Sequence, residues 1–377
     1  MVEVCEKFGY ENYTASPLEY AELFEAKSGQ EIVENEMYNF KDKGGRKIVL
    51  RPEMTPTIAR MIAAKNVEIP RPIRWYSIPN LFRYEKPQKG RLREHYQLNV
   101  DIFGIEGIEA EVELIKIGYK IMKNLKARDS DYTIRINNRK IIDSLFSNFI
   151  NNKTKKYELY KILDKKKKIS DENFRELIEN ILGEKTESFI RIIESGKLEN
   201  CSKFSKKEDV LETEELLEKL RNSGIKNVVF DLTLMRGFDY YTGIVFEFFD
   251  TYPENNRSMF GGGRYDDLLD IFGQKKIPAV GFGMGDVTAK NFLEIRGNLP
   301  ELKSKTDIAI LILKPEFQKT ADKFATELRI QGKNIEVDYT YRKIDKQINS
   351  AKKRGISKII VVGKEEEESQ KYKIKNL

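Results

Sequence analysis

Charged and aromatic residues interrupt an apolar part of the chain in the stretch TLMRGFDYYTG, from Thr233 to Gly243. The flanking sequences, NVVFDL and IVFEFF, are rich in residues that favour half-buried strands. We therefore expect Arg236 and Asp239 to lie close to a core, where an unpaired charge is costly. Charges in such a place need a partner or a ligand.

A second group of polar residues alternates with apolar ones in LREHYQLNVDIF. If this stretch is a strand, one face carries five polar side chains: Arg93, His95, Gln97, Asn99 and Asp101. The other face is apolar and packs on helices. The polar face suits a small polar ligand, but an antiparallel sheet with one solvated face is common and explains this strand alone at least as well.

The strand before this one ends at Phe82-Arg83-Tyr84-Glu85, and the connecting loop adds three cations, Lys86, Lys89 and Arg91. A cationic loop beside a polar sheet face suits a phosphate-bearing ligand, although many basic loops are simply solvated. Glu53 stands where a strand gives way to a helix, which suits either a ligand contact or the helix N-terminus. MFGGGRYDD matches neither phosphate-binding glycine motif, and its glycines fit a close backbone approach or a tight turn equally well.

The composition is that of a globular protein with more than one domain. The 377 residues are enough for two or three domains, and a net charge of +7 is compatible with a polyanionic partner without establishing one. No apolar run approaches the roughly 20 residues that span a bilayer, and no signal-peptide pattern is present. Two distant cysteines, Cys5 and Cys201, indicate a reducing cytoplasm. His95 is the single histidine, which argues against a zinc site or a Ser–His triad, and we expect it to be structural or to face a nucleic acid.

Secondary-structure signals divide the chain into four parts. EMYNFKDKGGRKIVLRPE predicts a hairpin that turns at residues 43–45, and Thr55-Pro56 predicts the cap and first position of a helix. The lysine- and glutamate-rich stretch 137–222 predicts a helical insertion, whose run 165–168 is interpreted as a solvated helix end rather than a nucleic-acid contact. After residue 303, strand and helix signals alternate as in a small α/β domain with a largely parallel sheet. The expected boundaries are 1–136, 137–222, 223–298 and 303–377.

Together these segments resemble the histidyl-tRNA synthetases, a family of class II aminoacyl-tRNA synthetases. RGFDYYTG followed by GGGRYD is similar to the paired histidine-specific signatures, and LRPEMT to the substrate-binding segment. FRYEKPQKGR with HYQLNVDIFG resembles class II motif 2, and residues 13–17 (YTASP) resemble the end of motif 1, at the dimer interface. The resemblance implies an α+β catalytic domain, in which helices flank an antiparallel sheet and a helical insertion interrupts the chain. The C-terminal part resembles the family's α/β anticodon-binding domain.

The resemblance also implies an activity. A family member is a histidine–tRNA ligase, which uses ATP to convert L-histidine to histidyl-adenylate and transfers the histidyl group to tRNA(His). Mg²⁺ enters with ATP, and no organic cofactor, zinc or other metal held by protein side chains is expected. The implied protein is a cytoplasmic homodimer with no membrane association.

Roles carried over to matching residues explain the charges in the opening stretch. Arg236 holds the α-phosphate and the histidine carboxylate from one side, Arg83 holds the α-phosphate from the other, and Asp239 orients Arg236 or a tyrosine. The catalytic set implied is Arg236, Arg83 and Gln97. The histidine-binding set is Glu53, Thr55 and Gln97 for the ammonium group and backbone, Asp101 and Tyr241 for the imidazole nitrogens, Tyr240 beside them, and Arg236. The ATP-binding set is Arg83, Glu85, Arg91 and Arg236, and the acceptor end of tRNA is met by Lys86, Lys89 and Arg91.

Several features depart from the family pattern. Where motif 3 usually places an arginine, the chain has Asp286-Val287-Thr288, so either another cation (Arg264 or Lys290) replaces it or ATP binding is weakened. Many family members carry glutamate where Asp101 stands, so the shorter carboxylate requires a water or a small shift. The segment that usually precedes motif 1 is absent. The C-terminal domain lacks its last helix, which leaves an edge of its sheet uncovered.

Two other functions stay open. A synthetase-like regulatory subunit of ATP phosphoribosyltransferase shares the fold and binds histidine without aminoacylation, but it normally lacks the anticodon-binding domain and degrades the signature around the arginine. A tRNA-binding module without chemistry leaves the intact amino-acid pocket unexplained. The chain retains both the domain and the signature, which favours the ligase.

Overall fold

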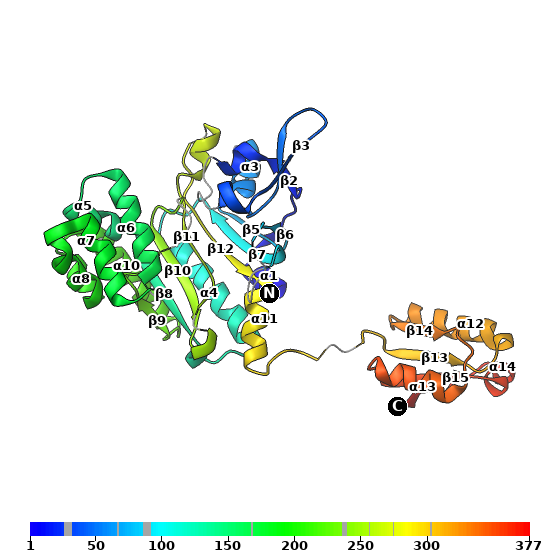
Figure 1. Cartoon of the computed structure of the whole chain (residues 1–377). Helices are drawn as coiled ribbons and strands as arrows, with labels where there is room; N and C mark the ends of the chain where they lie inside the picture. Colours follow the sequence, from blue (N-terminus) through cyan, green and yellow to red (C-terminus); the bar gives the residue numbers. More distant parts are fainter. Residues whose placement is uncertain are drawn as a thin grey trace. The chain divides into compact units, whose positions relative to one another are not determined.

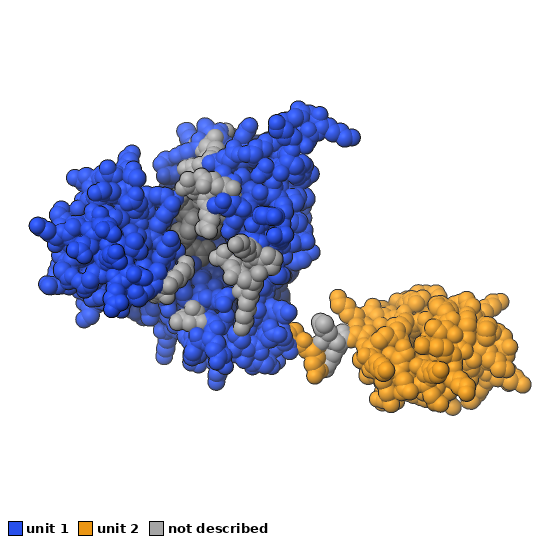
Figure 2. Space-filling view, viewed as in Figure 1, with its two compact units in different colours: residues 1–299 blue, residues 300–377 orange. Residues whose placement is uncertain are grey.

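The computed structural model describes residues 1–25, 32–65, 68–85, 92–166, 169–235, 240–255, 257–273, 275–301 and 304–377. The chain divides into two compact units, residues 1–299 and residues 300–377 (Figure 2). Within the described ranges, each helix is too short or too polar to cross a membrane.

A large, mainly antiparallel sheet forms the centre of the first unit (Figure 1). Among the described residues it has nine strands in the order β1-β5-β7-β12-β11-β10-β8-β9, with β6 also paired to β7. The β1–β5 and β8–β9 pairs are parallel, and the others are antiparallel. The strands are β1 (Glu11–Asn12), β5 (Ile73–Ser77), β6 (Asn80–Phe82), β7 (Glu94–Phe103), β8 (Tyr132–Asn138), β9 (Val228–Phe230), β10 (Ile244–Asp250), β11 (Ser258–Arg264) and β12 (Ala279–Gly285). The predicted antiparallel sheet flanked by helices is confirmed.

Among the described residues, the helices that cover one face of this sheet include α1 (Val2–Lys7), α4 (Glu109–Asn124) and α11 (Asp286–Ile295). The apolar side chains of β7, Leu98, Val100 and Ile102, join the core beneath these helices. Each such side chain contributes roughly 1.5–3 kcal/mol when fully buried. Because side chains alternate along a strand, Gln97, Asn99 and Asp101 point to the other face. The predicted alternation along β7 is confirmed.

The other face is covered at one end by α3 (Thr55–Lys65) and η6 (Leu268–Phe272), which contact each other. A second apolar core lies there and includes Ile58 of α3, Phe103 of β7 and Leu268. The helix α3 begins at Thr55 itself, so Thr55 is not the cap that the sequence predicted. Pro56 lies in the first turn, where a missing N–H leaves no intrahelical bond unmade.

A small sheet extends from this end of the unit. Its strands β2 (Leu18–Tyr20), β4 (Lys47–Leu50) and β3 (Tyr38–Lys41) are antiparallel, and α2 (Ala21–Glu25) and the single turn η1 (Ile32–Glu36) lie between β2 and β3. The predicted hairpin is confirmed: Gly45 has a φ of 78°, and Asp42 Oδ1 accepts from the backbone N–H groups of Gly44 and Arg46, each at 2.9 Å.

Helices occupy the chain between β8 and β9 and gather beside that edge of the sheet (Figure 1). They are α5 (Arg139–Phe149), α6 (Lys153–Lys165), α7 (Asp171–Leu182), η4 (Gly183–Lys185), α8 (Thr186–Ser195), α9 (Leu198–Cys201) and α10 (Lys207–Asn222). Three of these helices start with a side-chain cap, from Asn138, Asn152 and Ser170. Residues 167 and 168 of the predicted lysine run lie outside the described residues.

The second unit is a small α/β domain. Parallel strands β14 (Ile335–Asp338), β13 (Ile308–Ile312) and β15 (Lys358–Val362) alternate with η7 (Pro315–Phe317), α12 (Gln318–Ile330) and α13 (Ile344–Lys353), and α14 (Lys364–Ser369) follows. The predicted parallel sheet is confirmed. The sequence predicted that an edge of this sheet is uncovered; beside β15 the last residues return as a two-residue strand, β16 (Lys375–Asn376), antiparallel to β15. The N–H of Leu377 also donates to the carbonyl oxygen of Ser357 at 2.9 Å, which covers this edge.

Candidate active site

Glycines of β12 form the floor of a polar site on the sheet face opposite α4. The register places Gly281 opposite Asp101, Gly283 opposite Asn99 and Gly285 opposite Gln97. A Cβ atom on Gly281 would overlap the Asp101 carboxylate and lie 2.6 Å from the hydroxyl oxygen of Tyr265. A Cβ atom on Gly283 would overlap the amide of Gln97. The polar side chains of β7 therefore lean over β12 in space that only glycine leaves open.

The middle of the site is an amide pair on β7. Gln97 Nε2 donates to Asn99 Oδ1 at 2.7 Å, and Asn99 Nδ2 donates to the carbonyl oxygen of Gln97 at 3.0 Å. Asn99 is buried, whereas Gln97 is half-buried. The amide of Gln97 is thus held in one orientation near solvent, where it can meet a ligand.

A buried carboxylate lies two residues further along β7. The Tyr265 hydroxyl donates to Asp101 Oδ1, and both side chains are buried. Burial raises the pKa of Asp101 to about 7, although the hydrogen bond from Tyr265 opposes the shift. Burial, together with the charge of Asp101, raises the pKa of Tyr265 well above 10, so this phenol stays protonated. The sequence pointed to Asp101 but missed Tyr265, although the strand alternation in GGGRYD places Tyr265 on this face.

The start of α3 brings two predicted residues to the same region. The Tyr240 hydroxyl donates to Glu53 Oε2 at 3.2 Å and lies 3.4 Å from Thr55 Oγ1. The ring of Tyr240 is 5.7 Å from that of Tyr265, and the ring of Tyr241 is 4.8 Å from that of Tyr240. The structure therefore groups Glu53, Thr55, Tyr240 and Tyr241 with the Asp101–Tyr265 pair. The carboxyl group of Glu53 at this place suits an ammonium group.

Arg83 lies at the other side of the Glu53 segment. Its Nε donates to the carbonyl oxygen of Pro52 at 3.0 Å, and the side chain is half-buried. Burial and the positive charge of Arg83 lower the pKa of His95, while Asp286 and Glu85 oppose the shift. His95 is therefore neutral at pH 7.

Five predicted residues lie outside the described residues: Lys86, Lys89, Arg91, Arg236 and Asp239. The structure describes their neighbours in the chain, Glu85 before the first three and Tyr240 after the last two. Their roles stay predictions from the sequence.

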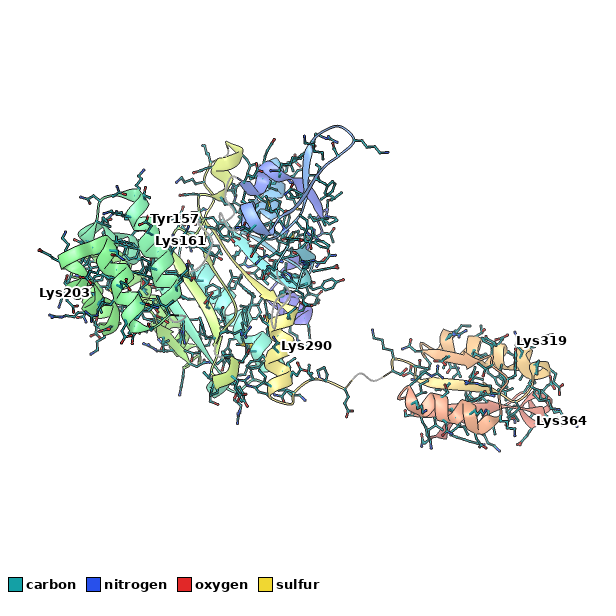
Figure 3. All side chains as sticks on the ribbon, in the orientation of Figure 1. Tyr157, Lys161, Lys203, Lys290, Lys319 and Lys364 are labelled. Carbon is teal, nitrogen blue, oxygen red and sulfur yellow. The ribbon has the colours of Figure 1, made fainter. Side chains whose placement is uncertain are left out.

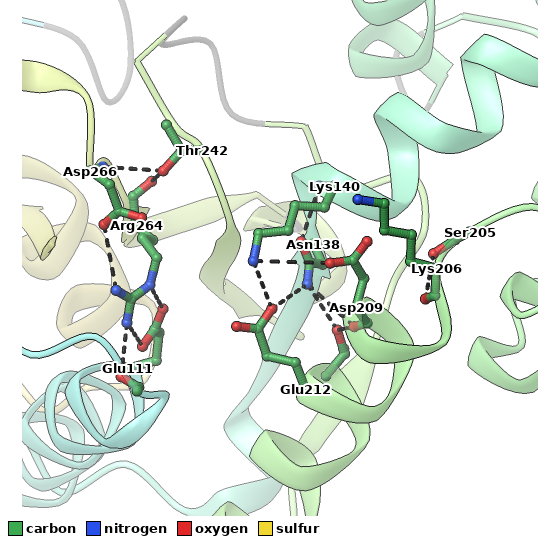
Figure 4. Close-up of polar contacts among 12 residues, drawn as sticks. Glu111, Asn138, Lys140, Ser205, Lys206, Asp209, Glu212, Thr242, Arg264 and Asp266 are labelled. Atoms are coloured by element: carbon green, nitrogen blue, oxygen red, sulfur yellow. Dashed lines mark hydrogen bonds and ion pairs between the residues drawn. The ribbon is translucent and has the colours of Figure 1, made fainter. Parts of the chain in front are cut away.

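Arg264 does not replace the motif 3 arginine. Its guanidinium donates from Nε and Nη2 to Glu111 of α4, each at 2.6 Å, and Nη2 also donates to the carbonyl oxygen of Gly107 (Figure 4). Both side chains of the pair are buried. Arg264 is opposite Val280 in the register, so it points to the helix-covered face and away from the glycine floor.

The start of α11 supplies no arginine either. The Thr288 hydroxyl lies 2.8 Å from the carbonyl oxygen of Met259 and 3.0 Å from that of Gly285, so it bonds to the backbone just before the helix. Lys290 is exposed on α11 (Figure 3) and stays a candidate cation. In the part of the chain that the structure describes, no group of three or more His, Cys, Asp or Glu residues could hold a metal ion. The site offers carboxylates, amides, phenols and an arginine, which bind and orient a ligand rather than attack it.

Comparisons with known proteins identify the family of the chain. A family model described as histidyl-tRNA synthetase matches residues 1–286, and one described as anticodon binding domain matches residues 307–377. The histidine–tRNA ligase of Leptospira biflexa is 38% identical over 383 residues, which cover 100% of this chain and 88% of that protein. The histidine–tRNA ligase of Haloarcula marismortui is 35% identical over 100% of this chain and 88% of its own.

Two solved structures have the same fold. A histidyl-tRNA synthetase from Nostoc superposes with a TM-score of 0.83 at 24% identity, over 100% of this chain and 89% of that one. A protein from Bacillus halodurans, described as an ATP phosphoribosyltransferase regulatory subunit/histidyl-tRNA synthetase, gives a TM-score of 0.78 at 24% identity, over 96% and 91% of the two chains.

The buried ion pair makes a stability prediction. We expect Arg264→Ala to lower the free energy of unfolding of the first unit by about 3–5 kcal/mol, because Glu111 keeps a buried charge without its partner. The measurement is urea unfolding followed by the fluorescence of Trp75, the single tryptophan, which lies on β5 in this unit. Arg264→Met combined with Glu111→Leu should recover much of the loss, since no charge stays buried. Lys7→Ala, which breaks an exposed pair with Glu3, serves as the control. A loss for Arg264→Ala as small as that of the control would contradict the assigned role.

Proposed function

The chain belongs to the histidyl-tRNA synthetase family, and from this premise we propose that it is a histidine–tRNA ligase. The reaction converts L-histidine and ATP to histidyl-adenylate and then transfers the histidyl group to tRNA(His). The observation that carries the proposal is the grouping of Glu53, Thr55 and Tyr240 with Asp101 and Tyr265 on one glycine-floored sheet face.

This grouping has the polarity of a histidine molecule. Glu53 and Thr55 receive the ammonium group, and Gln97 receives the backbone. Asp101 and Tyr241 bind the imidazole nitrogens. The support is geometric, since Tyr240 contacts Glu53 and lies beside Tyr241, and so joins the ammonium end to the imidazole end. Any side chain that cannot pair with Asp101 leaves a buried carboxyl group unsatisfied, a penalty that can reach 10⁴–10⁵ in discrimination.

The first chemical step needs no general base, because the attacking histidine carboxylate is already ionised at pH 7. It attacks the α-phosphorus of ATP, and pyrophosphate leaves with Mg²⁺, which enters as part of the substrate. Arg83 and Arg236 neutralise the charge that develops on the α-phosphate, so catalysis is positioning plus electrostatics. The bond from Arg83 to the Pro52 carbonyl oxygen supports this role, because it fixes the guanidinium beside the segment that carries Glu53.

The remaining predicted contacts complete the proposal. Glu85 and Arg91 bind ATP, and Lys86, Lys89 and Arg91 meet the acceptor end of tRNA. Residues 1–136 and 223–298 form the catalytic domain, 137–222 the helical insertion, and 303–377 the anticodon-binding domain. The match of residues 307–377 to the anticodon-binding model supports the last assignment. Both cysteines are free and buried, as suits a cytoplasmic protein.

We also propose that the protein is a homodimer, and that the small sheet β2-β4-β3 lies in the interface. On one face of this sheet Leu50 of β4 lies between Leu18 and Tyr38, and Ile48 lies between Tyr20 and Phe40. Leu18, Tyr20 and Phe40 are 45%, 48% and 46% exposed in the single chain, so apolar side chains form adjacent exposed rows. The sheet directly follows residues 13–17, which resemble the end of motif 1, and this continuity favours a second copy as the partner.

The activity is tested first by exchange of labelled pyrophosphate into ATP with Mg²⁺ and without tRNA. We expect exchange with histidine and none with the other amino acids. Arg83→Ala and Arg236→Ala should each lower the exchange rate at least 10²-fold, as expected when a donor to the transition state is lost. Lys203→Ala, an exposed lysine of the helical insertion (Figure 3), should not change it. Full activity of Arg236→Ala would refute its role, and histidine binding without exchange in the wild type would favour the regulatory subunit.

The dimer is tested by light scattering during gel filtration at micromolar concentration. The wild type should have twice the 44.0 kDa mass of the chain. Phe40→Glu together with Tyr20→Glu should yield monomers, because the substitutions place four charges across a two-fold interface without partners. Ile330→Glu changes an 81% exposed apolar residue of the second unit and should stay dimeric. A dimer that tolerates the Phe40 and Tyr20 changes would exclude this face.

A further inference from the structure

Asp101 is a buried acid, and the residues that the structure describes around it include no basic partner. Its side chain is 4% exposed, and Tyr265 donates the hydrogen bond that the carboxylate receives. Among the described residues, Asp101 forms no ion pair with an arginine, a lysine or the histidine. A buried carboxylate in such a place is stabilised strongly by any cation that a ligand brings to it.

The described elements packed around Asp101 present the phenol groups of three tyrosines. Tyr265 directly follows β11, and Tyr240 and Tyr241 precede β10. Trp75 of β5 and Gly281 of β12 are the cross-strand neighbours of Asp101, and neither carries a charge.

Two further groups complete the surroundings. Tyr13 stacks on Trp75, and burial and the nearby Asp101 charge raise its pKa, so it is a neutral phenol. Arg51 lies near Tyr13, but its guanidinium is held by the carbonyl oxygens of Ala15 and Asn80, at 2.7 and 3.1 Å. With Glu53 against Tyr240, this end of the pocket holds two carboxylates, and the described residues around Asp101 add no cation.

We propose that histidine is bound with a protonated ring, as an imidazolium that pairs with the Asp101 carboxylate, and that Tyr265 is the positioning residue that holds this carboxylate. The inference rests on the proposed function and adds the protonation state that the pocket selects. The two carboxylates then match the two cations of the ligand, the ammonium at Glu53 and the imidazolium at Asp101. Tyr265 keeps its proton and donates to the carboxylate throughout.

The proton count follows from this pairing. The complex holds one proton on the ring, and the Asp101 carboxylate is ionised. In the free state near pH 8, the ring of histidine and Asp101 are both mostly deprotonated, since the ring has a pKa of about 6.5 and burial raises the pKa of Asp101 to about 7. Binding at pH 8 therefore takes about 0.9 proton from solvent. Near pH 6 both groups already carry protons, so binding releases about 0.7 proton.

Calorimetry in two buffers of different ionisation enthalpy measures this proton count. Histidine is titrated into the full chain at pH 8 and pH 6, with Asp101→Asn as the matched variant that keeps the size of the side chain. The wild type should take up about 0.9 proton more than the variant at pH 8, and this difference should fall to about 0.1 at pH 6. Taking the difference cancels protons gained by the ammonium group. No difference at pH 8 would overturn the proposal.

A second measurement does not depend on the variant. Ring-labelled ¹⁵N-histidine bound to the wild type at pH 8 should show both ring nitrogens protonated, and a neutral ring would overturn the proposal. The analogue 1,2,4-triazol-3-ylalanine, which has a much less basic ring, should bind at least 10-fold more weakly than histidine. Equal binding of the analogue would also contradict the imidazolium.

Tyr265→Phe separates positioning from a purely structural role. It should weaken histidine binding about 10-fold and leave ATP binding unchanged, because the lost bond was made to a charged group. It should also reduce the proton uptake at pH 8, since Asp101 loses a bond that lowers its pKa and is more often protonated before binding. A weaker affinity with unchanged uptake would overturn the role given to Tyr265. Histidine-dependent pyrophosphate exchange in the same preparation, with no proton uptake, would refute this inference and leave the ligase intact.

Discussion

The site depends on one steric constraint: β12 carries no side chain where it faces Asp101 and Gln97. A Cβ atom at Gly281 would displace both the Asp101 carboxylate and the Tyr265 hydroxyl, and the bond that holds the buried acid would be lost. The strand can afford these glycines because its alternate residues, Val280, Phe282 and Met284, are buried in the core under α4 and α11. In AVGFGMG, the apolar residues on one face of the strand pack into the core, and the glycines on the other face leave room for the side chains of Asp101 and Gln97.

The next strand connects the two faces. In GGGRYD, Arg264 turns to Glu111 of α4, and Tyr265 turns to Asp101 in the pocket. The next N–H, that of Asp266, donates to Thr242 Oγ1 at 3.1 Å and so ties this strand to the segment that carries Tyr240 and Tyr241. Loss of the buried ion pair therefore affects the helix layer and the pocket wall together. The segment GGGRYD therefore connects the helix-covered core, through Arg264, with the ligand face of the sheet, through Tyr265.

Sequence patterns predicted the architecture best where polar and apolar residues alternate clearly along a strand. The alternation along β7 placed Gln97, Asn99 and Asp101 on one face, and Gly44-Gly45 predicted the hairpin turn. The same sequence could not assign Arg264, because the face of a side chain depends on the strand register, which three consecutive glycines leave open. The short strand β16 was also missed, since two strand residues near Leu377 give too short a pattern to recognise. Tyr265 was overlooked because its role depends on the contact with Asp101, which is distant in the sequence and is brought close only by the fold.

Charge is divided across the proposed complex in a way that fits the reaction. In the proposed complex, the end of the pocket with the carboxyl groups of Glu53 and Asp101 takes the cationic groups of histidine. The end with Arg83 is cationic and takes the phosphates, and burial together with Arg83 keeps His95 neutral there. We propose that the histidine carboxylate lies at the boundary, attracted by Arg83 and repelled by the acids, and so is directed toward the α-phosphorus. An amino acid without a second cation leaves Asp101 uncompensated, so discrimination comes from the free energy of a buried charge and needs no closer fit in shape.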